Sequence, residues 1–139
     1  MRKIVQNMLH AIRHGRQQTI GNTTTIPDSL FHTEDGLEDE WGVAVRLHCS
    51  TIAFVPDDVD APVRISLAGF DTATTRNRLD AIVWEFCGVH VFRASGQTVL
   101  RARGKQPRPL PLTGWTEVDR KQLWRRNAPG IPVIPSRRR

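Results

Sequence analysis

The segment GFDTATTRNRLDAI, residues 69–82, places hydroxyl and guanidinium side chains around the predicted start of a helix. The first turn of a helix leaves backbone N–H groups unpaired and carries a positive potential. Hydroxyls beside these amides, with arginines just beyond, are the ingredients of an anion or phosphate site. The residues of this predicted site are Thr74, Thr75, Arg76 and Arg78.

A purely structural interpretation of the same segment competes with the anion site. Asp71, Thr72 or Thr74 can be the N-cap of the helix, because each side chain can accept a hydrogen bond from an amide two or three residues later. The arginines would then be solvated. The sequence leaves both interpretations open.

Basic side chains are concentrated in the last third of the chain. Residues 1–100 hold 9 Lys and Arg against 12 Asp and Glu, whereas residues 101–139 hold 11 against 2. This asymmetry favours contact with a polyanion, with tryptophans among the charges available to stack on unpaired bases; a solubilising, partly disordered terminus is the alternative. The residues predicted to contact nucleic acid are Arg101, Arg103, Lys105, Arg108, Trp115, Arg120, Lys121, Trp124, Arg125 and Arg126.

Signatures of catalysis and cofactor binding are missing from the sequence. It contains no G-x-x-x-x-G-K-[ST] loop, no G-x-G-x-x-G loop and no G-x-S-x-G elbow. A metal set sketched from His48, Cys49, Cys87 and His90 matches no familiar zinc spacing, and reduced core thiols are the favoured interpretation. We therefore expect neither a cofactor nor a metal, and we favour a non-enzymatic protein.

No stretch approaches the roughly 18 consecutive apolar residues of a membrane span, and the basic N-terminus has no signal-peptide core. The sequence therefore predicts a cytoplasmic protein without a membrane partner. Its oligomeric state is left open.

The periodicity of apolar residues predicts the elements that must position these side chains. The i, i+3, i+4 spacing predicts helices over 4–12 and from the Thr/Arg segment to Phe86. Alternation predicts strands, and Pro27 is expected to end a Thr-rich one or to place it at a sheet edge. The predicted strands lie at 21–26, 41–49, 52–55, 63–67, 89–94 and 98–103, the last two as a hairpin, with an acidic loop at 31–40, a solvated link at 104–112 and a short helix at 116–126.

The predicted fold class is α+β: a small antiparallel sheet with one central helix packed on it, an N-terminal amphipathic helix, and a basic Pro-rich C-terminal tail. The predicted divisions are the N-terminal helix at 1–18, the core domain at 19–103, and a partly disordered tail at 104–139.

Three motifs, GNTTTI at 21–26, LHCSTIA at 47–53 and GFDTATTRNRLDAI at 69–82, carry a resemblance. In order and spacing they resemble a group of small phage-encoded proteins of unknown function, whose pattern runs GNT, LHxxxIA and GxxTxTTRxRLNA before a hydrophobic hairpin. The match covers about residues 20–103, and Asp80 stands where the pattern has Asn. The resemblance implies a phage or prophage accessory protein acting inside a bacterial cell.

These observations lead to a functional hypothesis with two alternatives. We expect a non-enzymatic accessory protein that binds the phosphates of DNA or RNA through its basic C-terminal segment. The first alternative is a host-takeover or anti-defence factor that binds a host protein. The second is a small-anion or nucleotide binder at the Thr/Arg helix start.

Overall fold

Alternating apolar side chains build a six-stranded antiparallel sheet in the computed structural model, which describes residues 3–32 and 39–120. The segment expected to be a strand at 41–49 is the middle of this sheet, with Val43, Val45 and Leu47 buried on one face. The strands, in hydrogen-bonded order, are β1 (Gln18–Ile20), β2 (Thr23–His32), β3 (Asp39–Leu47), β4 (Ser50–Pro56), β5 (Val63–Ile65) and β9 (Thr116–Val118).

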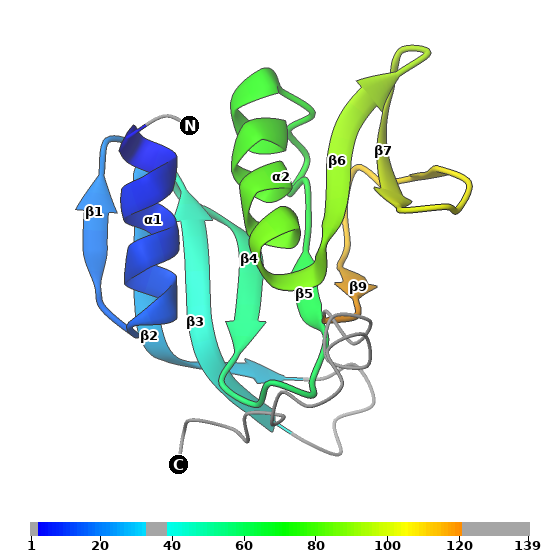
Figure 1. Ribbon diagram of the computed structural model, residues 1–139. Helices are drawn as coiled ribbons and strands as arrows, with labels where there is room; N and C mark the ends of the chain where they lie inside the picture. Colours follow the sequence, from blue (N-terminus) through cyan, green and yellow to red (C-terminus); the bar gives the residue numbers. More distant parts are fainter. Residues whose placement is uncertain (1–2, 33–38, 121–139) are drawn as a thin grey trace.

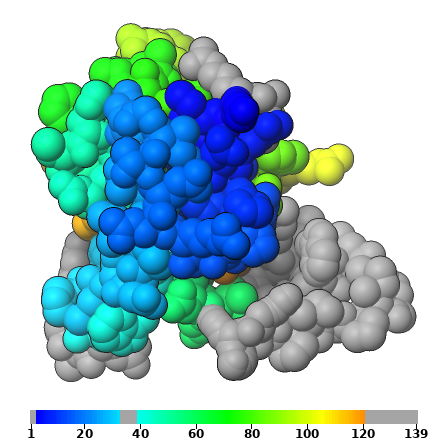
Figure 2. Space-filling model, turned by 90° about the vertical axis from the view of Figure 1, so that its left-hand side faces the viewer, coloured from blue at the N-terminus to red at the C-terminus, as the bar shows by residue number. Residues whose placement is uncertain are grey.

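The predicted hairpin forms a second sheet. Its strands are β6 (Val89–Ala94) and β7 (Gln97–Ala102), and β8 (Arg108–Pro109) adds a third. Ser95 and Gly96 at the tip have φ of 52° and 77°, the left-handed backbone of a tight hairpin turn. In both views the yellow segment that follows β7 stands out from the body (Figure 1, Figure 2).

Two helices cover the same face of the six-stranded sheet (Figure 1). Helix α1 (Lys3–Arg13) lies against β1 and β2, as Figure 2 also shows, and helix α2 (Ala73–Cys87) contacts β4, β5 and β6. The apolar stripes predicted for both helices join one core with the sheet. Neither of these two helices, within the part of the chain that the structure describes, is long and apolar enough to cross a membrane.

The ends of α2 agree with its sequence signals. Thr72 is the N-cap and its hydroxyl accepts a hydrogen bond from the Thr75 backbone amide at 3.2 Å. Gly88 ends the helix with φ of 71°, a left-handed conformation that costs glycine little. Of the three N-cap candidates in the sequence, the structure selects Thr72.

The predicted fold class is wrong. The described chain is mostly β, with a six-stranded and a three-stranded antiparallel sheet and two helices, where the sequence suggested a small sheet with one central helix. Two strands shorter than four residues, β1 and β9, widen the main sheet at its edges, and they are too short to show an alternating pattern.

The chain between the hairpin and Asp119 accounts for much of this difference. Expected as a solvated link, it contains β8 and the buried Leu110, whose backbone amide donates to the Thr98 carbonyl at 2.9 Å. The helix expected to begin at Thr116 is absent over 116–118, because β9 pairs with β5 and buries Val118 there. Residues 121–126 of that predicted helix lie outside the described part.

Pro27 was expected either to end its strand or to place it at a sheet edge, and the structure shows the second outcome. Strand β2 runs past it to His32, with a register shift between Ile26 and Ser29. Because β1 pairs only with residues 23–25, the proline lies where β2 has β3 as its one described neighbour. Phe31, His32 and Glu40, expected in the acidic loop, are strand residues. The centre of that loop, 33–38, lies outside the described residues.

Gly42 is required by the close packing of β3 against β4. A Cβ atom at this position would lie 2.3 Å from the Val55 carbonyl oxygen and 2.9 Å from the Phe54 ring. The ring of Phe54 thereby covers a glycine on the sheet face away from the helices, and Phe54 is fully buried although no helix lies over it.

We predict that Gly42→Ala lowers the free energy of unfolding by about 3 kcal/mol, because the new methyl group collides with backbone that cannot rotate away. Chemical denaturation measures the loss. The control is Gly15→Ala, where a Cβ meets open space but φ is +60°, so that only about 1 kcal/mol of backbone strain is expected. Equal losses in the two variants would contradict the packing argument.

Candidate nucleic-acid interface

Arg76, predicted to hold an anion, is paired within the protein. Its guanidinium donates to the Asp71 carboxylate at 2.7 Å. Asp71 also accepts a hydrogen bond from the Thr98 hydroxyl on β7. The Thr98 bond and then the Arg76 bond and charge, with Arg93 adding its charge, lower the pKa of Asp71 against an opposing effect of burial. The Arg76 charge is therefore engaged in joining α2 to the three-stranded sheet.

Arg78, the second predicted arginine, is only 4% exposed. Its Nε donates to the Thr23 hydroxyl on β2 at 3.0 Å, and its terminal nitrogen donates to the Asn77 side chain at 2.7 Å. A buried guanidinium needs such partners because its N–H groups have left water. Arg78 thus fixes α2 on the sheet.

The hydroxyls of the predicted anion site are divided between core and surface. Thr75 is buried, and its hydroxyl lies 3.0 Å from that of the N-cap residue Thr72. Thr74 is exposed. The structure brings the four predicted residues to the start of one helix, but three of them contact the protein's own residues.

The three sequence motifs meet at one end of the main sheet. In addition to the Arg78–Thr23 bond, the Asn22 carbonyl accepts from the His48 backbone amide at 2.8 Å, and the Asn22 amide nitrogen lies 3.4 Å from His48 Nε2. His48 has φ of 57° in the turn between β3 and β4. Residues of all three motifs therefore serve to hold the fold together.

The three-stranded sheet carries exposed charge of one sign. Residues 86–116 contain five basic residues and no Asp or Glu. All five side chains are exposed, and none forms an ion pair with a described acidic side chain; Arg108 donates to the Glu117 backbone carbonyl at 3.4 Å. We call them the basic sheet surface: Arg93, Arg101, Arg103, Lys105 and Arg108.

Four of these five residues were predicted from the sequence to contact nucleic acid, and Arg93 was not. The charge asymmetry pointed only to residues after 100, whereas Arg93 lies on β6 opposite Thr98 of β7. The hairpin pattern was the signal that could have found it, because strands of a hairpin share their faces.

The remaining predicted residues lie elsewhere. Arg120 donates to the Pro56 carbonyl at 3.4 Å and lies over the Phe86 ring. Trp115 packs edge-on against Phe31, with ring centres 5.2 Å apart, on the sheet face opposite the helices. The others, Lys121, Trp124, Arg125 and Arg126, lie outside the described residues.

The sketched Cys/His metal set is not assembled in the described ranges, where no three His, Cys, Asp or Glu side chains are grouped as ligands. Cys49 is exposed, while the buried Cys87 thiol contacts the Val118 carbonyl oxygen at 3.6 Å. His90 stacks on Trp84 with ring centres 4.5 Å apart and bonds Asp80 at 3.0 Å.

Fold and surface together define a small two-sheet β protein whose lesser sheet presents a basic surface. The family model of the Kyanoviridae Gp96 protein matches residues 1–118, and the chain belongs to this phage protein family. Its membership confirms the expected phage origin; the finer motif pattern stays a prediction. No curated protein and no solved structure matches the chain.

We predict that Asp71→Asn lowers the free energy of unfolding by about 1 kcal/mol at neutral pH, because charge-assisted bonds to Arg76 and Thr98 are weakened. The lowered pKa means that the carboxylate stabilises the fold above its unfolded pKa, near 3.8, and that this contribution is lost as the pH falls through the folded pKa. The difference between the two proteins should therefore shrink in acid.

Urea unfolding at several pH values measures this difference. Asp119→Asn, at an exposed site, is the matched control and should change the free energy of unfolding by less than about 0.5 kcal/mol. A difference at Asp71 that is the same in acid as at neutral pH would contradict the assigned role of the carboxylate.

Proposed function

We propose that this phage protein binds nucleic acid without catalysing a reaction, through contacts between the basic sheet surface and backbone phosphates. The observation that carries the proposal is the set of exposed cations on β6, β7 and β8 and between β7 and β8, which form no ion pair with a described acidic side chain and have no acid near them in sequence from residue 86 to 116. Such a surface attracts a polyanion whatever its sequence.

The contrast with the other arginines supports this assignment. Arg76 is bound to Asp71, Arg78 is buried, and Arg64 is bound by Glu40 and Glu117. Charges engaged in this way are already compensated, so that they gain little from a phosphate. Arg101, Arg103 and Lys105 lack such compensation from the described residues and face solvent.

We expect Arg101→Gln/Arg103→Gln to weaken binding of labelled duplex DNA and to flatten its salt dependence. The slope of log K against log salt should decrease in magnitude by about 1.8, because each lost phosphate contact removes about 0.9. Fluorescence anisotropy between about 50 mM and about 200 mM salt measures both quantities.

The control removes the same two charges elsewhere, in Lys3→Gln/Arg16→Gln, whose side chains are exposed on and after α1. Its affinity should fall only slightly and its salt slope should stay close to that of the unaltered protein. Failure of the unaltered protein to bind DNA or RNA at low salt would refute the proposed function, and so would an affinity that is independent of salt.

A second candidate function, binding of a host protein, is favoured by two exposed apolar side chains. Phe70 and Leu112 are 58% and 53% exposed, and the Gly69 amide donates to the Leu112 carbonyl at 2.8 Å, which keeps their segments together. Capture of one host protein that survives nuclease treatment and is lost in Phe70→Ser would favour this function over nucleic-acid binding.

A further inference from the structure

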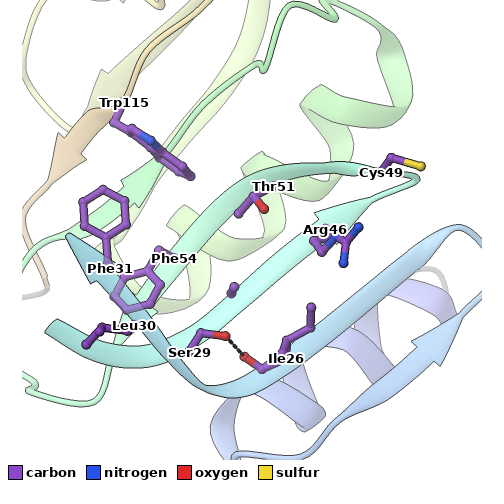
Figure 3. Close-up of a pocket in the computed structure, with 10 residues that line it drawn as sticks. Ile26, Ser29, Leu30, Phe31, Arg46, Cys49, Thr51, Phe54 and Trp115 are labelled. Carbon is purple, nitrogen blue, oxygen red and sulfur yellow. Dashed lines mark hydrogen bonds between the residues drawn. The ribbon is translucent and has the colours of Figure 1, made fainter. Parts of the chain in front are cut away.

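The face of the six-stranded sheet that the helices leave uncovered is hollowed. The hollow has a volume of about 520 Å³ and is lined by residues of β2, β3 and β4 and by Trp115 (Figure 3). Ala44 lies between Ile26 and Phe54 in cross-strand register. Because opposite residues share a face, the small alanine between two large side chains creates the depression.

Aromatic rings close one end of the hollow. Phe31 lies 5.2 Å from Phe54 and 5.2 Å from Trp115 between ring centres, and Figure 3 shows the Trp115 indole leaning over the hollow from the segment before β9. Trp115 is only partly buried. A partly exposed indole beside an open depression offers a surface on which a planar group can stack.

A cation lies farther along the same hollow. The Arg46 guanidinium extends over the sheet beside Thr51 and Ile26 (Figure 3). It has no hydrogen-bond or ion-pair partner among residues 3–32 and 39–120. Arg64, on the same face, is bound by Glu40 and Glu117 and lies 4.5 Å over the Phe31 ring. Arg46 is therefore available to an anionic group, whereas Arg64 supports the aromatic cluster.

We propose that this hollow binds an unpaired nucleotide of a single-stranded nucleic acid, with the base stacked at Trp115 and a neighbouring phosphate paired with Arg46. Stacking on aromatic side chains combined with cations along the backbone is the usual mode of single-strand binding. A paired base in a duplex cannot present its face to Trp115. This inference rests on the proposed function and deepens it by naming the form of nucleic acid.

The hollow is connected to the basic sheet surface. Arg108 of that surface donates to the carbonyl of Glu117, and Trp115 lies between the two residues in sequence. Strand β9, which contains Glu117, pairs with β5 in the main sheet. A single-stranded nucleic acid whose phosphates contact β7 and β8 can therefore continue across β9 to the indole of Trp115.

The test compares labelled oligothymidine with a duplex of equal length. We expect Trp115→Leu and Arg46→Gln each to weaken oligothymidine binding about tenfold, the loss of one stacked base or one phosphate contact, while duplex affinity changes less than about twofold. Arg101→Gln/Arg103→Gln should weaken both ligands. Trp41→Leu, at an exposed tryptophan of β3, and Arg16→Gln are the matched controls and should bind like the unaltered protein.

Cross-linking keeps the test decisive if a variant folds poorly. An oligonucleotide carrying photoreactive iodouracil should cross-link the unaltered protein at Trp115 or Phe31. The proposed role of the hollow would be overturned by cross-links elsewhere together with unchanged single-strand affinity in Trp115→Leu and Arg46→Gln. Phosphate binding by the basic sheet surface would remain possible in that case. If the unaltered protein binds neither ligand at low salt, the proposed function fails as well.

Discussion

The structure depends on covering one face of a six-stranded sheet with two short helices. Val45, Val63 and Ile65 are fully buried on that face, and α1 and α2 supply the apolar side chains that exclude water from them. The chain has no described helix for the other face. There it relies on Phe54 lying over Gly42 and on Phe31 and Trp115 beside it. Burial by a few aromatic rings leaves part of a face open, and the hollow lies in that part.

Position in the fold decides which arginines carry an available charge. Arg78 lies between helix and sheet, where burial demands hydrogen bonds. Arg76 meets the carboxylate of Asp71 just before its own helix, and Arg64 meets that of Glu40 on β3. The cations of β7 and β8 belong to a sheet that contains no acid, and the segment between these two strands stands out from the body (Figure 1). The paired arginines and the exposed cations are thus side chains of the same kind, and they differ in whether an acidic or polar partner lies within reach.

Local signals in the sequence were sufficient for the elements that they describe. The apolar spacing and capping residues of α2, the stripe of α1 and the hairpin of β6 and β7 were all predicted and found. The fold class was not, since β1, β8 and β9 are short and form only because another strand offers them a partner. The same reason hid the hollow: Ile26, Ala44 and Phe54 become neighbours through register across three strands, which no single segment encodes.

In the proposed function, the two surfaces would contribute differently to the binding of nucleic acid. Exposed cations gain affinity mainly by releasing counterions from the nucleic acid, so their contribution declines as salt rises and is the same for every sequence. An indole at the edge of the hollow gains affinity from stacking, which salt affects little and which requires a base freed from its partner. A protein with both surfaces is expected to associate with any polynucleotide at low salt and to retain single strands selectively as salt rises. The short segment from Arg108 to Glu117 would give this proposed selectivity a physical basis, because it contains both a cation of the basic sheet surface and Trp115.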